Sequence, residues 1–243
     1  MLKKGITALK HTSLHSKRGF TLLELSIVIV IIGLIVAGIS AGQSLVRQAQ
    51  LREVSSFGNN IATAFNSFKL QYDAVPGDID NAYDYWVASM DCTTDATTNN
   101  AGCNGDGDGL IETDGTLMEG YRAWEELAIL GLVDGSYSGN YTTALACTPG
   151  TTIPTILGSG GADLTNSNSR NILSLGANRT TGQLCDNELF TPSEASSIDI
   201  KADDGAPTTG NIRGVDGNGA TCLDGSAYDL DGEGAQCVIQ ILL

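Results

Sequence analysis

The glycine-rich stretch at residues 104–112, NGDGDGLIE, carries oxygen-bearing side chains at alternate positions 104, 106 and 108, and again at Glu112. Alternating oxygen ligands, with glycines that permit a sharp turn, are typical of loops that hold a hard cation such as calcium. Calcium is therefore the cofactor that these residues suggest. The pattern assigns five ligands, which are the side chains of Asn104, Asp106 and Asp108, the carbonyl of Leu110, and Glu112 directly or through water.

This calcium motif is incomplete. Its twelfth position normally carries a bidentate acid, but Gly115 stands there, with Asp114 beside it. A glycine–aspartate turn closed by a Cys92–Cys103 disulfide is the competing interpretation of the same residues.

The six cysteines all follow an apolar N-terminal segment, at positions 92, 103, 147, 185, 222 and 237. An even number of cysteines behind an export signal predicts three disulfides, formed in an oxidising compartment. Six cysteines allow 15 connectivities. The set that needs only local closure is Cys92–Cys103, Cys147–Cys185 and Cys222–Cys237. No C-x-x-C pair is present, which disfavours cysteine-rich zinc sites and thioredoxin-like redox chemistry.

The chain is strongly acidic, with 13 basic and 28 acidic residues and a net charge of −15. Five of the basic residues lie in residues 1–19, so removal of that segment would leave 8 basic residues and a net charge of −20. Such a surface repels nucleic acid phosphates, which argues against nucleic acid binding. A second acidic stretch between Cys222 and Cys237 favours a solvated disulfide loop over a calcium site, and it contains Asp224, Asp229, Asp231 and Glu233.

Both histidines, His11 and His15, precede the apolar segment, and the rest of the chain contains none. The later part therefore lacks Ser–His and Cys–His nucleophile pairs, histidine general bases and histidine metal ligands. Catalysis by paired carboxylates is the remaining enzymatic class, and no pattern points to it. The sequence predicts a protein that is not an enzyme.

The apolar segment runs from Phe20 to Gly42, 23 residues with the single charge of Glu24. As a helix it is long enough to span a bilayer. No basic residue follows it before Arg47, so the N-terminus is expected to stay cytoplasmic and the rest to be exported. The basic residues that precede it are Lys3, Lys4, Lys10, Lys17 and Arg18.

Two simple interpretations of this segment are a signal anchor and an ordinary signal peptide cleaved near Ser40 or Gly42. Neither accounts for Glu24, because a charge at membrane depth is energetically costly. Neither accounts for the helical pattern that continues beyond the membrane.

The residues from Lys17 to Leu25 read KRGFTLLEL. This stretch resembles the prepilin processing motif of type IV pilins and type II secretion pseudopilins. The resemblance implies cleavage after Gly19 by a prepilin peptidase, N-methylation of Phe20, and pairing of Glu24 with the amine of a neighbouring subunit. Many members of the family carry a proline where this chain has Ala41, which puts the filament rise in doubt.

A helix of roughly 80 Å is expected from Phe20 to about Tyr72, ended by Val75-Pro76-Gly77-Asp78. Its second half carries one apolar stripe, made of Val54, Phe57, Ile61, Ala64 or Phe65, Phe68 and Tyr72. The aromatic residues at 83, 85 and 86 are expected to pack near its end. A second helix is expected over residues 118–132, and long loops with short strands over residues 134–182. Strands are expected at Ser197–Ile200, Asn211–Val215, Thr221–Leu223 and Cys237–Leu243.

The predicted fold class is α+β, a pilin-like lollipop. Its long N-terminal helix, with a membrane half and an amphipathic half, packs on a small antiparallel-sheet globular domain with long disulfide-stapled loops. The expected domains are a cytoplasmic leader at 1–19 that is removed, a transmembrane and filament-core half-helix at 20–42, an amphipathic half-helix at 43–74, and a globular domain at 75–243.

The function expected from this resemblance is a structural subunit of a type IV pilus or a type II secretion pseudopilus, polymerised through its N-terminal helix. Its expected partners are other pilin-like subunits, the prepilin peptidase, the assembly machinery and, before assembly, the inner membrane. The expected location is the bacterial inner membrane as a single-pass protein, and later a periplasmic pseudopilus or a cell-surface filament. The alternative is a membrane-anchored, calcium-dependent adhesin or binding module that does not polymerise.

Overall fold

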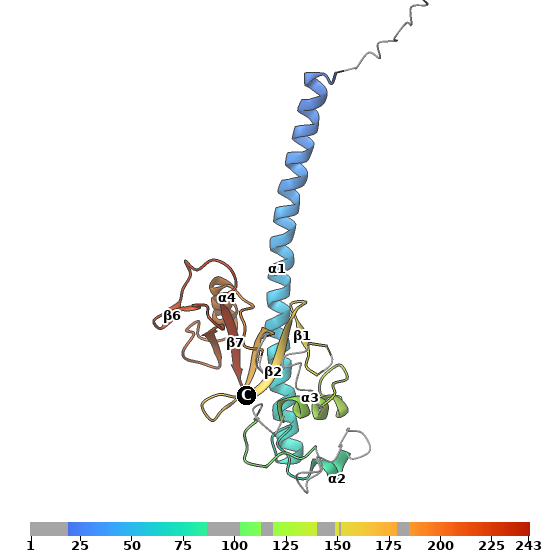
Figure 1. The fold of residues 1–243 in the computed structure, drawn as a ribbon, viewed down its shortest axis with the longest axis vertical. Helices are drawn as coiled ribbons and strands as arrows, with labels where there is room; N and C mark the ends of the chain where they lie inside the picture. The colour runs from blue at the N-terminus through green and yellow to red at the C-terminus, as the bar shows by residue number, and fades with distance from the viewer. Residues whose placement is uncertain (1–18, 87–102, 113–118, 140–148, 151, 179–184) are drawn as a thin grey trace, which may run out of the picture. The chain divides into compact units, whose positions relative to one another are not determined.

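The computed structural model describes residues 19–86, 103–112, 119–139, 149–150, 152–178 and 185–243. The chain divides into two compact units, residues 1–47 and residues 48–243, and one long helix runs through both. The helices are α1 Leu22–Tyr72, α2 Ala82–Trp86, α3 Glu119–Ile129 and α4 Pro192–Ala202 (Figure 1). The strands are β1 Thr155–Ile156, β2 Gly160–Asn166, β3 Asn171–Ala177, β4 Ile212–Asp216, β5 Leu223–Asp224, β6 Ala227–Tyr228 and β7 Cys237–Leu242.

Helix α1 is one uninterrupted element of 51 residues, which confirms the predicted long N-terminal helix. It ends at Tyr72 because Asp73 adopts a left-handed backbone with φ of 54°. The Asp73 N–H donates to the Lys69 carbonyl at 2.9 Å, and this contact satisfies one of the last helical carbonyls. The predicted breaker around Pro76 follows a few residues later.

In the unit formed by residues 48–243, α1 contributes its apolar stripe to the hydrophobic core. Its buried residues are Leu51, Val54, Gly58, Ile61, Ala64, Phe65 and Phe68. Gly58 permits a close approach to the sheet, since a Cβ there would lie 2.3 Å from Cδ1 of Ile241 on β7. The predicted stripe is therefore largely confirmed, although Phe57 and Tyr72 are only partly buried.

The core sheet has five antiparallel strands in the order β1-β2-β3-β7-β4, as the predicted fold class requires. The last strand of the chain, β7, therefore lies between β3 and β4. Its register pairs Ile241 with Leu173 on β3 and with Ile212 on β4. Strands β5 and β6 form a separate two-stranded sheet.

The predicted strand at Ser197–Ile200 is wrong, because these residues lie in α4. The side chain of Thr191 accepts a hydrogen bond from the Glu194 amide, and the Glu194 side chain accepts one from the Thr191 amide. This capping box, with Pro192 as the first helical residue, nucleates a helix that overrides the strand propensity of the later isoleucines.

The prediction of long loops with short strands over residues 134–182 is confirmed only in part, because the strands are longer than expected. These residues contain β2 and β3, each seven residues long. Six residues of each strand are buried, so neither strand has the exposed face that is typical of a half-buried strand. Even the polar side chains of Asp163 and Thr165 on β2 are buried. The predicted strands at 211–215 and 237–243 correspond to β4 and β7, whereas the one at 221–223 shares only Leu223 with β5.

Helix α3 confirms the helix predicted at 118–132, and its Tyr121 and Trp124 are fully buried. The aromatic segment after α1 forms α2, where Trp86 packs against Tyr72 with ring centroids 5.2 Å apart. This contact places the aromatic residues at the end of α1, as predicted.

The predicted Cys222–Cys237 disulfide is present, with 4.9 Å between the Cα atoms. It ties the first residue of β7 to the loop before β5 across a separation of 15 residues, a loop whose closure stabilises a fold by about 3 kcal/mol. Cys103 and Cys185 are disulfide-bonded as well. The predicted pairs Cys92–Cys103 and Cys147–Cys185 each include a cysteine outside the described residues, so these two pairings stay predictions.

Candidate functional site

The first candidate site lies at the start of α1, where Thr21 and Glu24 form a reciprocal cap. Oε2 of Glu24 accepts hydrogen bonds from the Thr21 amide at 2.8 Å and from the Thr21 hydroxyl at 2.9 Å. The Glu24 amide donates to Oγ1 of Thr21 at 3.2 Å. This arrangement satisfies two otherwise unpaired groups at the helix terminus. The helix therefore orients the Glu24 carboxylate, and Oε1 accepts no bond from the described residues.

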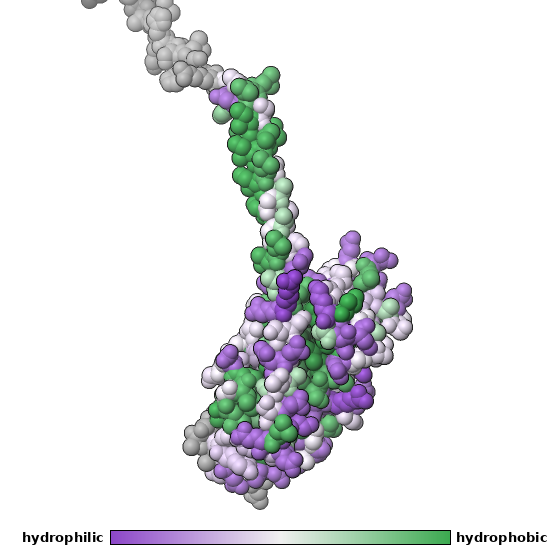
Figure 2. Space-filling model, turned by 180° about the vertical axis from the view of Figure 1, so that it is seen from behind, coloured by the Kyte–Doolittle hydropathy of each residue, from purple (hydrophilic) through white to green (hydrophobic). Residues whose placement is uncertain are grey.

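Beyond this cap, α1 exposes an almost unbroken series of large apolar side chains. Leu22 is 88 % exposed, and every large apolar side chain from there to Val46 is at least half exposed. Figure 2 shows this part of the helix as a hydrophobic band. In the part of the chain that the structure describes, α1 is the one helix whose length and composition would allow it to cross a membrane.

The family model of the prokaryotic N-terminal methylation motif matches residues 14–40. The chain carries the prepilin-type signal. This signal is the type IV pilin and pseudopilin motif, and it includes Gly19, Phe20 and Glu24. No curated protein and no solved structure matches the chain.

The prepilin-type signal indicates a subunit of the type IV pilin or pseudopilin type, which is a structural protein and not an enzyme. It also implies processing by a prepilin peptidase. Together with the single apolar helix at the N-terminus, it fits a protein anchored in the membrane by one span.

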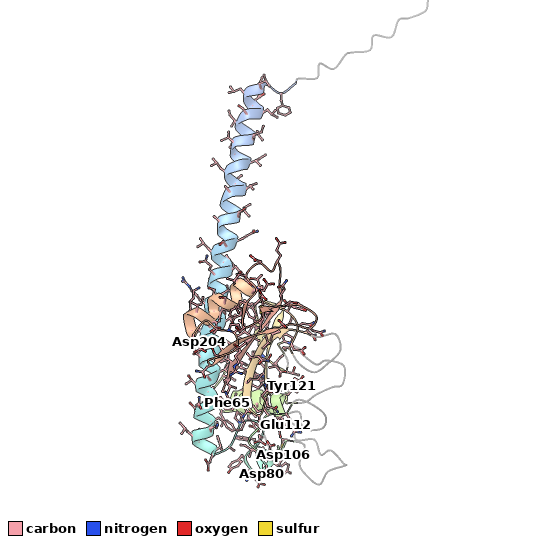
Figure 3. The ribbon with its side chains drawn as sticks, turned by 90° about the vertical axis from the view of Figure 1, so that its left-hand side faces the viewer. Phe65, Asp80, Asp106, Glu112, Tyr121 and Asp204 are labelled. Atoms are coloured by element: carbon pink, nitrogen blue, oxygen red, sulfur yellow. A yellow bond between two sulfur atoms is a disulfide. The ribbon has the colours of Figure 1, made fainter. Side chains whose placement is uncertain are left out.

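The second candidate site is the acidic loop at residues 104–112. Asp106, Asp108 and Glu112 each offer a carboxylate oxygen, and these three oxygens lie within 4.8 Å of one another. Figure 3 labels Asp106 and Glu112 near one another, well away from Asp204. Oε2 of Glu112 is buried and accepts no hydrogen bond from an N–H or hydroxyl group of the described residues. Converging carboxylates with an orphaned buried oxygen fit a hard cation.

The other two residues predicted as ligands, Asn104 and Leu110, take part in hydrogen bonds between a side chain and a backbone amide. Oδ1 of Asn104 accepts a hydrogen bond from the Tyr83 amide at 2.9 Å, and the second lone pair of this oxygen could still coordinate a cation. The Leu110 amide donates to Oδ1 of Asp108 at 2.8 Å, which turns the chain within the loop.

Asp78 also belongs to this loop, and sequence reasoning missed it. Its two carboxylate oxygens accept hydrogen bonds from the amides of Gly107 and Gly109, both at 2.7 Å. The two segments also meet backbone to backbone, because the Gly105 amide donates to the Ile79 carbonyl at 2.8 Å. A Cβ on Gly105 would lie 2.4 Å from Cα of Asp78, so this approach requires glycine.

Glu119, at the start of α3, is the second residue that sequence reasoning missed. Its carboxylate accepts hydrogen bonds from the amides of Asp106 and Glu112, at 3.2 and 2.9 Å. Asp78, Asp106 and Glu119 also bring carboxylate oxygens within 4.8 Å of one another. The helix predicted at 118–132 begins shortly after the loop in sequence. Its first acidic residue was therefore the signal that could have predicted a contribution of Glu119 to this site.

Burial changes the acidity of these two groups. It raises the pKa of Asp78 to about 6, and the nearby Asp108 and Asp106 add to the rise. Burial likewise raises the pKa of Glu119, and its carboxyl lies close enough to that of Glu112 to share a proton. Carboxyl groups that approach this closely need either a shared proton or a cation between them.

The second acidic stretch forms no comparable cluster in the described part of the chain, where Asp224, Asp229, Asp231 and Glu233 do not converge. Another group, Asp199, Asp203 and Asp204, does converge at the C-terminal end of α4. Its carboxylates are occupied by protein donors, including the Tyr228 hydroxyl at 2.8 Å and the Ile212 amide at 2.9 Å. These acids therefore hold the connection from α4 to β4 in place.

Proposed function

We propose that this chain is a structural subunit of a type IV pilus or a type II secretion pseudopilus, processed after Gly19 and polymerised through α1. The observation that carries the proposal is the prepilin-type signal, whose Glu24 lies in the first turn of a helix with an exposed apolar surface. An exposed apolar helix must be covered by lipid or by other helices. A pilus core made of such helices supplies that cover after the subunit leaves the membrane.

The chemistry of assembly rests on Glu24 and the amine that cleavage exposes on Phe20. A buried ion without a partner is strongly destabilising, whereas a paired ion is tolerated. Because Thr21 occupies Oε2, the other carboxylate oxygen is available to a methylated amine from a neighbouring subunit. This pairing would fix the axial stagger between subunits.

The N-terminal mass of the protein isolated from its host tests the processing step. The expected mature chain begins with N-methylated Phe20, and replacement of Gly19 by a bulky residue such as valine should leave residues 1–19 attached. Intact-mass and peptide mass spectrometry measure both. An intact leader on the natural protein, or cleavage after Gly42, would contradict the proposal and favour a non-polymerising membrane-anchored binding module.

We also propose that the loop at 104–112 binds calcium. Asp106, Asp108 and Glu112 provide the converging carboxylates, and Asn104 and Leu110 would complete the oxygen shell. An ion there would stabilise the junction between this loop, residues 77–79 and the start of α3. Because this junction lies in residues 48–243, which are expected to be exported, calcium would cross-link segments of the fold in addition to the disulfides.

Thermal unfolding of the full chain in detergent tests the calcium site. Calcium at about 100 times its dissociation constant should stabilise the fold by about 2.7 kcal/mol, which corresponds to a Tm increase of about 5 to 10 °C. The double substitution Asp106→Asn and Asp108→Asn should abolish this increase.

The matched control is Asp224→Asn with Asp231→Asn, since both acids are exposed and lie in the other acidic stretch. This variant should keep the full calcium response. An equal response in both double variants, or none in the natural chain at millimolar calcium, would rule out the site.

A further inference from the structure

The five-stranded sheet has a second face, whose side chains Ile172 and Val238 are buried but lie outside the main core cluster. Along β3 and β7 the core face carries Leu173, Leu175, Ile239 and Ile241. The alternate residues, among them Ser174 and Gln240, point to the other face. A groove of about 540 Å³ crosses this outer face, and its lining includes Arg170, Ile172, Arg213, Val215, Gln240 and Leu242.

Two arginines that line this groove have no partner among the residues that the structure describes. Neither the Arg170 nor the Arg213 side chain makes a hydrogen bond or ion pair with any residue that the structure describes. Nε of Arg213 is buried and has no acceptor among those residues. A buried charged donor without an acceptor is costly, so an incoming acceptor would be favoured.

The acid nearest in register cannot serve as that acceptor. Arg213 pairs with Gln240, Gln240 with Ser174, and Ser174 with Asp163, so Asp163 stands in the same row of side chains. Three strand spacings of about 4.8 Å separate Asp163 from Arg213, a distance of roughly 14 Å. Since no other residue in the described ranges bonds to them either, both guanidinium groups can bind a ligand from outside the sheet.

The charge of the whole chain indicates what that ligand is. After removal of residues 1–19, 8 basic and 28 acidic residues remain, so every copy presents many carboxylates and copies repel one another. A guanidinium binds a carboxylate with two parallel hydrogen bonds, a geometry that gives both strength and specificity. Two arginines in one groove, with no partner among the described residues, are complementary to the carboxylates of another copy.

We propose that this groove, lined by Arg170 and Arg213, docks carboxylate side chains of a neighbouring copy of the chain in the assembled fibre. The inference rests on the proposed function. A groove on one copy that receives an acidic segment from a different surface of the next copy makes a heterologous contact, and such contacts generate open helical filaments. The contact would hold the exported units together while α1 forms the fibre core.

Site-specific photo-crosslinking in fibre-forming cells tests this docking. A benzophenone amino acid replaces Thr208, which is exposed and lines the groove. Irradiation should join two copies of the chain, and mass spectrometry should locate the link on an acid-containing peptide. The double substitution Arg170→Glu and Arg213→Glu should reduce the crosslinked pair by at least about tenfold, as expected for the loss of a docked charge pair.

Lys201→Glu is the matched control, because Lys201 is exposed but lies on α4, outside the groove. It should leave the yield unchanged. Arg170 lies in an exposed turn, so the single substitution Arg170→Glu should leave the Tm unchanged. A lower crosslink yield in this variant at an unchanged Tm would exclude unfolding as the cause of the loss. An equal yield in natural and reversed chains, or a link to another protein, would overturn the inference.

Loss of docking in the groove and loss of fibre formation give different experimental results. Fibres of methylated chain without a crosslink at Thr208 would overturn the groove inference and leave the proposed function standing. A chain with an intact leader and no fibres would refute the proposed function and the docking that depends on it.

Discussion

Replacement of Glu24 by glutamine is expected to give a processed protein that stays in the membrane and no longer grows fibres normally. Glutamine keeps a side-chain oxygen that can accept the hydrogen bonds of Thr21, so the cap of α1 survives. It removes the negative charge that would meet the amine of the neighbouring Phe20. The experiment therefore separates charge pairing from helix capping.

The expected size of this effect follows from the cost of an unpaired buried ion. Loss of one partner of a buried pair costs about 3 to 5 kcal/mol, and each 1.4 kcal/mol is about a tenfold change in an equilibrium constant. Subunit addition should weaken by roughly a hundredfold or more, so sheared surface fractions should contain little or no subunit.

The matched control for this variant is Glu53→Gln, since Glu53 is exposed on the same helix beyond the apolar stretch. Immunoblots of membrane and sheared fractions, with electron microscopy of the fibres, measure the outcome. Normal fibres from Glu24→Gln, or equal loss in Glu53→Gln, would refute the charge-pairing account.

Replacement of Asp163 by asparagine is expected to change how stability depends on pH. Asp163 lies on β2 and is only 1 % exposed. Neither of its oxygens accepts a hydrogen bond of normal geometry from the described residues. Burial raises the pKa of Asp163 to about 8, and the nearby amides of Cys185 and Leu164 offset the rise only in part.

The direction of the pH effect follows from which state holds the proton. An aspartic acid in the unfolded chain titrates near a pKa of about 4. Between about pH 4 and pH 8 the folded chain keeps a proton that the unfolded chain has lost, so stability falls as pH rises. The limiting slope is about 1.4 kcal/mol per pH unit, or up to about 5 kcal/mol over the whole range.

Urea unfolding of the full chain in detergent, followed by tryptophan fluorescence, measures this effect. The unfolding free energy of the natural chain should fall relative to that of Asp163→Asn from pH 4 to pH 8, and the difference should level off above pH 8. Asp224→Asn, at an exposed acid, should show no such divergence. Parallel pH curves for natural chain and Asp163→Asn would show that Asp163 does not carry the proton.

Much of the architecture is readable from local patterns. The KRGFTLLEL stretch predicts the processing signal, and the period of apolar residues predicts α1 and its end near Tyr72. The short separation of Cys222 and Cys237 favoured their pairing, and the apolar C-terminal residues predicted β7. Where α4 replaced a predicted strand, the decisive signal was also local, namely the cap at Thr191 and Pro192.

The residues that surround the acidic loop could not be predicted from local sequence patterns. The pattern at 104–112 contains its own carboxylates, but Asp78 bonds to Gly107 from 29 residues away, and Glu119 joins from the start of α3. The burial of Asp163 and the shared groove of Arg170 and Arg213 depend equally on distant strands.

The sequence by itself determined the processing signal, the long apolar helix and the acidic character of the chain, because residue type and short-range spacing are sufficient to specify them. Tertiary structure alone decided which acids become buried, which arginines line one groove, and which residues hold the loop at 104–112. The physical reason is that burial and charge proximity depend on which distant segments pack together, and the order of strands in the sheet sets that packing.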